Sequence, residues 1–238
     1  MALSELWPGG PLFDPGGGMP LGMDSLLLAD FARPARGRAL ELCCGAAAVT
    51  LLLLSRMPGL EADGVELLPA AARSAERNLA ANGLERRARV ICGDIRAHRA
   101  LLKAGAYSLC VCNPPYFPAG SGRASSDRAR ALARSEMECT LADVLDAAAW
   151  SLRTGGAFCV VHRPERLAEL MALMRAHALE PKRLRLVQST AASAPSLVLA
   201  EGRRGGAPGL KIEPPLIVRT DSGGESAEYR RICHRGDT

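Results

Sequence analysis

Aromatic side chains are scarce in this chain of 238 residues, where two Trp, three Tyr and four Phe make up 4% of the sequence. The interior must therefore be built mainly from Leu, Val and Ala. A chain of this length suits one large α/β domain that buries roughly three quarters of its unfolded surface.

The eight cysteines lack the spacing of a disulfide framework or a zinc site, because the chain has no CxxC and no cysteine–histidine ligand pattern. Most of them lie in apolar runs that we interpret as strands, namely Cys43, Cys92, Cys110, Cys112 and Cys159. This pattern is typical of small buried hydrophobic residues in a reducing compartment. We therefore expect no bound metal.

Long hydrophobic runs are also missing. The longest, residues 46–54, is far shorter than the roughly 20 residues that a membrane-spanning helix needs. The N-terminus lacks a basic head followed by an uninterrupted apolar core, so no signal peptide is predicted. We expect a soluble, cytoplasmic protein with no membrane partner.

Lysine provides only three of the thirty basic residues, and the formal net charge is +5. Residues 182–238 hold ten Lys or Arg against six Asp or Glu, which places +4 of that excess in the last quarter. The excess of Arg over Lys has two possible explanations. Arginine makes bidentate contacts with phosphate, and a GC-rich genome also favours Arg over Lys. The genomic explanation fits the composition better, and the phosphate explanation fits the placement better.

Strand and helix signals alternate from residue 38 to about residue 178. The predicted strands cover residues 39–43, 61–66, 89–92, 107–112 and 157–162, and residues 183–188 and 196–201 form a closing pair. This alternation predicts a parallel sheet with helices on both faces. Ligand sites in such sheets lie at the carboxyl ends of the strands.

Helix boundaries are marked by local signals. Pro69 opens one helix and Asn82-Gly83 closes it. Thr140 to Asp143 resembles a capping box, and the helix that it starts should run to about Arg153, where Gly155-Gly156 ends it. A further helix is expected from about Pro164.

The predicted fourth strand ends in Asn113-Pro114-Pro115-Tyr116. Neither proline donates a backbone hydrogen bond and each fixes its φ, so the turn is stiff and its carbonyls stay available. The Asn113 side chain and a proline carbonyl are two acceptors that suit a planar –NH2 group on a base or a glutamine, and Tyr116 could stack on that group. A proline-capped strand end with only a structural role is the alternative.

The first βα turn, Glu41-Leu-Cys43-Cys-Gly45-Ala-Ala47-Ala, is a degenerate glycine-rich pattern. Glu66 follows Gly45 by 21 residues, the spacing of the acidic residue that binds ribose hydroxyls in dinucleotide folds. Gly93-Asp94 ends the third strand and offers a backbone and carboxylate pair for an adenine edge. An NAD site remains an alternative, but no hydride-transfer constellation follows, and the Asn113 turn favours S-adenosylmethionine.

Two segments lie outside the alternating pattern. Residues 1–37 are rich in Gly and Pro as far as Gly22 and then turn helical, and residues 117–139 form a long loop with several arginines, including Arg134. Loops of this length are usually functional or disordered, and its position after the acceptor turn favours function. We divide the chain into a lid segment (1–37), a catalytic domain (38–203) and a basic extension (204–238).

The order of these motifs resembles the class I methyltransferases of the Asn-Pro-Pro-Tyr type. More narrowly, the chain is similar to the bacterial tRNA adenine-N6-methyltransferases that modify the adenosine beside the anticodon of a valine tRNA. The resemblance covers nearly all of residues 20–220 and rests on the stretches 22–28, 112–118, 131–136, 161–166, 180–185 and 208–211. The stretch Val161-His-Arg-Pro-Glu-Arg166 is the most discriminating.

This resemblance implies a Rossmann-like, seven-stranded and mainly parallel sheet with an antiparallel last strand. It implies S-adenosylmethionine as cofactor, tRNA as substrate, and catalysis by Asn113, Pro114, Pro115 and Tyr116. The implied cofactor contacts are Asp24, Leu27, Glu41, Cys43, Gly45, Glu66, Leu67, Gly93, Asp94, Ile95 and Asn113. The implied substrate contacts are Tyr116, Phe117, Arg134, His162 and Arg163.

The chain departs from the family pattern at two positions. Ala47 stands where a third glycine is usual, and Ser135 stands where His is usual. Three alternatives stay open: a protein glutamine methyltransferase, which would need a helical domain before the first strand; another base-amine methyltransferase acting on ribosomal RNA or DNA; and a binding protein that has lost catalysis.

Overall fold

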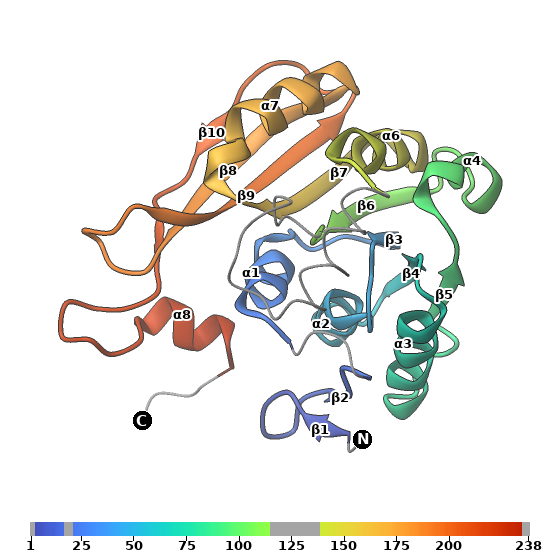
Figure 1. Cartoon of the computed structure of the whole chain (residues 1–238), viewed down its shortest axis with the longest axis horizontal. Coiled ribbons are helices and arrows are strands. Elements are labelled where there is room, and N and C mark those ends of the chain that lie inside the picture. Colours follow the sequence, from blue (N-terminus) through green and yellow to red (C-terminus); the bar gives the residue numbers. More distant parts are fainter. Residues whose placement is uncertain (1–2, 17–20, 115–138, 235–238) are drawn as a thin grey trace, which may run out of the picture.

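The computed structural model of the chain describes residues 3–16, 21–114 and 139–234. A small hairpin pairs β1 with β2, and all other strands form one sheet in the order β10-β8-β9-β7-β6-β3-β4-β5, with β11 also paired to β8 (Figure 1). The strands are β1 Ser4–Glu5, β2 Leu12–Phe13, β3 Gly37–Leu42, β4 Leu60–Glu66, β5 Ala88–Cys92, β6 Tyr107–Cys112, β7 Leu152–His162, β8 Leu179–Gln188, β9 Pro195–Arg204, β10 Lys211–Ile212 and β11 Leu216–Ile217.

The five strands β3 to β7 are parallel to one another, and β9 is inserted between β7 and β8, antiparallel to both. This confirms the predicted mainly parallel sheet with an antiparallel last strand among its seven long members. The strand number differs from the prediction, because β10 and β11 add two short parallel strands along β8 and make the sheet nine-stranded. The chain after residue 204 therefore contributes strands to the main sheet.

Helices cover both faces of the sheet, as the alternation predicted. The α-helices are α1 Met23–Phe31, α2 Ala48–Arg56, α3 Pro69–Ala81, α4 His98–Leu101, α6 Leu141–Ser151, α7 Leu167–Ala176 and α8 Ala227–Ile232, and the 3-10 turns are η1 Ile95–Ala97 and η2 Pro164–Arg166. Side chains of α1, α2, α3 and α8 share one hydrophobic core, whereas α6 and α7 enclose the core on the other face, where α4 also lies (Figure 1).

The local helix signals were correct in three places and wrong in one. Pro69 opens α3, Asn82 caps it before Gly83 at φ +64°, and Thr140 and Asp143 form a reciprocal capping box on α6. Gly155 and Gly156 do not end this helix, which stops at Ser151. They lie inside β7 at a register shift against β6, where a Cβ on Gly156 would come within 2.8 Å of the Arg153 carbonyl. The glycines therefore permit a bulge in the strand.

Two cysteines differ from the prediction of buried strand residues. Cys43 lies beyond the end of β3 in a left-handed turn at φ +56°, and Cys92 is exposed at the end of β5. Cys110, Cys112 and Cys159 are buried in strands, as predicted.

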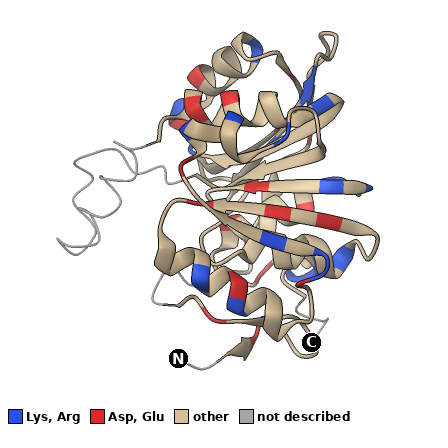
Figure 2. Ribbon diagram, turned by 90° about the vertical axis from the view of Figure 1, so that its right-hand side faces the viewer, with Lys and Arg blue, Asp and Glu red and all other residues tan. Residues whose placement is uncertain are grey.

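Several Arg side chains in the last quarter of the chain form ion pairs within the protein. Arg185 binds Glu228 at 2.9 Å, and Arg203 binds Glu201 at 3.0 Å. Figure 2 shows Lys and Arg interspersed with Asp and Glu over the described ribbon. The concentration of arginine in this quarter therefore has an intramolecular cause as well, which weakens the phosphate interpretation of its placement.

Arg183 on β8 joins the sheet to the end of α1. Its guanidinium contacts Glu201 at 2.8 Å and Glu213 at 3.4 Å, donates to the Phe31 carbonyl, and lies 3.8 Å from the centre of the Phe31 ring. A buried guanidinium is stable only when such partners replace water. Arg183 therefore fixes the C-terminal end of α1 against the sheet.

No helix in the described ranges is long and apolar enough to cross a membrane.

We predict that Arg183→Met lowers the free energy of unfolding by about 2–4 kcal/mol, since breaking a buried pair leaves a poorly compensated charge, although Arg203 still binds Glu201. Urea denaturation would measure the loss. Arg175→Met is the control, because Arg175 pairs with Glu180 at 3.5 Å from a side chain that is 69% exposed and should cost less than about 1 kcal/mol. Equal stability of the two variants would contradict this role for Arg183.

Candidate active site

The turn after β3 brings backbone N–H groups to the carboxyl edge of the sheet. Cys43, Gly45 and Ala47 all have left-handed φ values of 55° to 63°, a region that disfavours residues with a Cβ. A Cβ on Gly45 would meet no atom within 4 Å, so this part of the backbone borders open space. The turn can therefore approach a ligand closely, and Ala47 adopts the glycine-like conformation despite its methyl group.

Glu66, the last residue of β4, closes this turn. One carboxylate oxygen accepts from the Gly45 N–H at 2.8 Å, the other accepts from the Leu68 N–H at 2.9 Å, and the Glu66 carbonyl accepts from the Gly93 N–H at 2.9 Å. A carboxylate has about four acceptor positions, so Glu66 retains capacity for two further donors. These two acceptor positions suit the vicinal hydroxyls of a ribose, which would donate to them.

Glu41 lies beneath the same turn and is 4% exposed. One of its carboxylate oxygens accepts from both the backbone N–H and the hydroxyl of Thr50, at 2.7 and 2.5 Å. Burial raises the pKa of the Glu41 carboxyl to about 7; the hydrogen bonds from Thr50 oppose the shift, and the nearby Glu66 reinforces it. Glu41 thus braces the N-terminus of α2 with a carboxyl that titrates near neutral pH.

Asp94 and Ile95 follow β5 at the next strand end. The Asp94 carboxylate accepts from the backbone N–H of Arg96 at 2.9 Å and pairs with its guanidinium, which lowers the pKa of Asp94. Ile95 is buried, and Gly93 is packed so closely that a Cβ there would lie 2.8 Å from Leu101. An adenine contact of Asp94 would therefore share this carboxylate with Arg96.

Asn113 directly follows β6, and its side-chain NH2 donates to the Ser25 hydroxyl on α1 at 3.3 Å. On the same helix, burial raises the pKa of the Asp24 carboxyl, while a hydrogen bond from its own backbone N–H and the charge of Arg163 oppose this shift. Leu27 is fully buried. The first turn of α1 therefore contacts Asn113, the residue that follows β6. Pro115, Tyr116, Phe117 and Arg134 fall outside the described residues, as does Ser135.

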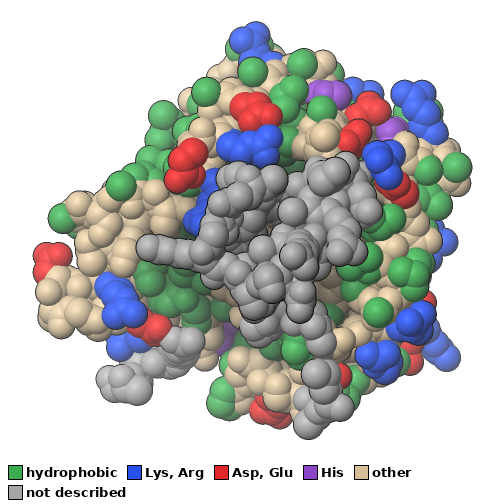
Figure 3. All heavy atoms as spheres, in the orientation of Figure 1, with side chains coloured by type: hydrophobic (Ala, Val, Ile, Leu, Met, Phe, Trp, Pro, Cys, Tyr) green, Lys and Arg blue, Asp and Glu red, His purple; other side chains and the backbone are tan. Residues whose placement is uncertain are grey.

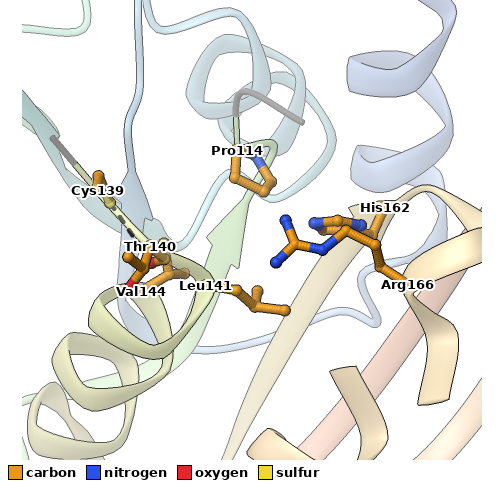
Figure 4. A pocket seen from close by; sticks show the side chains of 7 residues that line it. All are labelled: Pro114, Cys139, Thr140, Leu141, Val144, His162 and Arg166. Atoms are coloured by element: carbon orange, nitrogen blue, oxygen red, sulfur yellow. Dashed lines mark hydrogen bonds between the residues drawn. The ribbon is translucent and has the colours of Figure 1, made fainter. Parts of the chain in front are cut away.

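A pocket of about 190 Å³ opens beside this turn. Its lining residues are Pro114, Cys139, Thr140, Leu141, Val144, His162 and Arg166. Figure 4 shows the guanidinium of Arg166 pointing into the space between Pro114 and Leu141, with His162 on the same wall. Glu169 binds the Arg166 guanidinium through two contacts of 2.8 and 2.7 Å, which orient it.

His162 ends β7 and is 2% exposed. Its Nδ1 accepts from the Arg163 backbone N–H at 2.9 Å, so Nε2 carries the proton of the neutral ring. Burial and the charge of Arg166 lower the pKa of His162 to about 4. His162 is therefore a neutral hydrogen-bond donor at the pocket, and Arg163 lies beside it with its guanidinium donating to the Ser196 carbonyl at 3.2 Å.

Cys43 belongs to the turn after β3, and its thiol contacts Cys112 and Cys139, the second of which lines the pocket. Its hydrogen bond with Cys112, together with burial, raises its pKa well above the ordinary value. The thiol stays protonated at neutral pH and is poorly suited to nucleophilic catalysis.

The face in Figure 3 carries its Lys and Arg side chains in separate groups, several of them beside Asp or Glu. This arrangement resembles the pairing seen in the C-terminal quarter. A continuous basic surface is therefore not visible on the described part of this face.

Three contacts of the site were not anticipated from the sequence. Thr50 binds Glu41, Ser25 binds Asn113, and Arg166 lines the pocket. Ser25 and Arg166 stand within stretches that carried the family resemblance, so their position in the sequence was a signal. Thr50 offered none, because its contact depends on how α2 sits above β3.

Comparison with solved structures defines the fold class. A predicted O-methyltransferase from Agrobacterium tumefaciens matches with a TM-score of 0.73 at 19% identity, over 90% of this chain and 98% of that chain. At 19% sequence identity, this match supports a conclusion about the fold alone. The fold is that of the class I, Rossmann-like methyltransferases.

Sequence comparison then gives the family. The methyltransferase small domain family matches residues 22–178. The tRNA1(Val) (adenine(37)-N6)-methyltransferase of Tolumonas auensis is 35% identical over 76% of this chain and 75% of that protein. The enzyme of the same name from Dickeya chrysanthemi is 33% identical over 90% of this chain and 86% of that protein. The chain belongs to the methyltransferase small domain family and is an S-adenosylmethionine-dependent methyltransferase.

We predict that Glu66→Ala weakens S-adenosylmethionine binding by about 1.5–3 kcal/mol, the range for hydrogen bonds to a charged group. Isothermal titration would show an increase in Kd of roughly 10- to 100-fold. Glu61→Ala is the matched control, because Glu61 lies at the opposite end of β4 and pairs with Arg38. An unchanged affinity in Glu66→Ala would refute the ribose assignment.

The raised pKa of Glu41 predicts a distinct pH dependence of stability. Folding favours the protonated carboxyl, so the contribution is complete below about pH 4.5 and is lost as the pH rises through about 7. Relative to Glu41→Gln, the wild type should lose about 2–3 kcal/mol of unfolding free energy between pH 5 and 8. The comparison cancels the opposite effect of His162, which both proteins retain. Parallel profiles from chemical denaturation would contradict the buried carboxyl.

Proposed function

We propose that the protein transfers a methyl group to the exocyclic N6 of an adenine in tRNA, with adenosine 37 of a valine tRNA as the first candidate. The names of the two relatives support the substrate. The observation that carries the chemistry is the position of Asn113 and Pro114, which follow β6 immediately beside the turn closed by Glu66. A pair of acceptors next to a nucleoside site is what transfer to a base amine requires.

We assign the cofactor to the ends of β3, β4 and β5. Glu66 would bind the ribose, Asp94 and Ile95 the adenine, and the Glu41–Gly45 turn with Asp24 and Leu27 of α1 the methionine end. Leu67, Gly93 and Cys43 complete this wall. When bound, S-adenosylmethionine supplies an electrophilic methyl group on a sulfonium sulfur.

The acceptor turn acts on the amine. Adenine N6 is a poor nucleophile because its lone pair is delocalised into the ring. The Asn113 side-chain oxygen and the Pro114 carbonyl would accept the two N6 protons, draw the nitrogen toward tetrahedral geometry and direct its lone pair. No strong base is needed, because an N6 proton becomes acidic once the nitrogen is quaternised. Alignment of this kind is worth roughly 7–11 kcal/mol in well-oriented systems.

His162, Arg163 and Arg166 would contact the substrate. The His162 ring, which burial keeps neutral, would contact a base or ribose without adding charge. The Arg166 guanidinium, held by Glu169, can meet a phosphate at the pocket. Stacking of Tyr116 on the extruded base stays a prediction from the sequence, with a typical worth of about 1–3 kcal/mol.

The test is product identification. Total tRNA from a strain that lacks the endogenous adenosine-37 methyltransferase would be incubated with labelled S-adenosylmethionine and the protein, digested, and separated into nucleosides. We expect label in N6-methyladenosine alone. Label in another nucleoside, or in a protein acceptor offered in parallel, would overturn the proposal and favour one of the rival acceptors.

Asn113→Ala should lower the single-turnover rate on the same tRNA roughly 100-fold or more, the scale for loss of one preorganised hydrogen-bonding group. Its S-adenosylmethionine Kd should stay within about twofold of wild type, because the ribose and adenine contacts remain. Retention of most of the turnover would show that the Asn113 turn is structural.

A further inference from the structure

Helix α1, whose first turn carries Ser25, is anchored at its C-terminal end. Arg183 binds the Phe31 carbonyl at its C-terminal end, and Asp30 pairs with Arg56 at 3.0 Å and Arg231 at 3.2 Å. These partners come from β8, α2 and α8, so three separate elements fix the same end of the helix. A side chain on α1 therefore offers the site a stable reference point.

Ser25 is the residue of α1 whose side chain contacts Asn113. It is 8% exposed in a helix whose other buried residues are Leu27, Leu28, Ala29 and Phe31. A buried hydroxyl is costly without a partner, and its partner is the Asn113 side-chain NH2 at 3.3 Å. The contact joins residues that are 88 positions apart in the sequence.

The direction of this hydrogen bond has a chemical consequence. An asparagine amide has one acceptor oxygen and two N–H donors. When the NH2 group donates to Ser25, the oxygen lies on the opposite branch of the amide and stays available as an acceptor. A rotated amide would instead present N–H donors to the N–H donors of a substrate amine, which repel each other.

We propose that Ser25 is a positioning residue for methyl transfer, which holds the Asn113 amide so that its oxygen accepts from the substrate amine. The hydroxyl limits rotation of the Asn113 side chain, and the N–H of the amine then selects the oxygen. Ser25 acts through Asn113 and touches neither substrate nor cofactor in this role. The inference rests on the proposed function, because it presumes a base amine as acceptor.

Kinetics provide the first test. Ser25→Ala should lower the single-turnover rate on tRNA roughly five- to tenfold, the effect of one neutral hydrogen bond. Its S-adenosylmethionine Kd should stay within about twofold of wild type, and Ser25→Thr, which keeps a hydroxyl, should recover most of the rate. Ser151→Ala is the matched control, because Ser151 is a buried helical serine that bonds the carbonyl of Ala147 in its own helix.

A double-mutant cycle separates positioning from a general effect on the helix. In an Asn113→Ala background, Ser25→Ala should change the rate by less than about twofold, because the group on which it acts is gone. An equal loss in both backgrounds would overturn the proposal, as would a rate of Ser25→Ala within twofold of wild type. A parallel rise in the cofactor Kd would make Ser25 a cofactor ligand instead.

A spectroscopic readout tests the contact without catalysis. Asparagine occurs only at positions 78, 82 and 113, so protein labelled with ¹⁵N-asparagine gives three side-chain amide pairs, and Asn113→Ala identifies the third. Ser25→Ala should shift this pair and speed its exchange with water, while the pairs of Asn78 and Asn82 stay in place. An unmoved Asn113 pair would refute the hydrogen bond. A wild-type protein that methylates no tRNA adenine would instead refute the proposed function.

Discussion

The parallel pairing of β3 with both β4 and β6 is the constraint on which the site depends. After β3 the chain builds outward through β4 and β5, then returns to place β6 on the other side of β3. The ends of β4 and β6, which carry Glu66 and Asn113, therefore flank the turn after β3. Ligands bind at such reversals because the crossing connections leave a crevice there. The residues to which we assign nucleoside binding and amine binding thus become neighbours through topology, although 47 positions separate them in sequence.

Buried polar contacts convert this arrangement into a defined geometry. Glu66 spans the turn after β3 and the start of α3, and Arg183 ties α1 to β8 and Glu201. Buried ion pairs are weak sources of net stability but exclude alternative packings when every partner is satisfied. Several arginines of residues 182–238, for which the sequence suggested phosphate contacts, form such ion pairs within the protein instead. Arg183 and Arg231 bind the C-terminal end of α1, the helix whose Ser25 contacts Asn113.

The sequence predicted those features that have short-range causes. Pro69, Asn82-Gly83 and the Thr140 capping box mark helix ends through contacts within a few residues, and the strand ends follow from apolar runs. Gly155-Gly156 was misread because the same dipeptide ends a helix or permits a bulge, and only the pairing of β7 with β6 distinguishes the two. Strands β10 and β11, the Ser25–Asn113 contact and the Thr50–Glu41 contact all arise from packing between distant segments. Local pattern contains no information about such contacts.

The pKa values of two buried side chains at the site, Glu41 and His162, are shifted in opposite directions with a common result. Burial raises the pKa of Glu41 to about 7 and lowers that of His162 to about 4, so each shift favours the neutral form. His162 consequently adds no charge to the acceptor side, where a neutral amine must be held by hydrogen bonds alone. Glu41 is different, because a carboxyl that titrates near neutral pH becomes more ionised when a cation is bound nearby. Glu41, beneath the turn proposed for the methionine end of the cofactor, can therefore change its ionisation near neutral pH, whereas His162 stays neutral beside the charged Arg166 guanidinium.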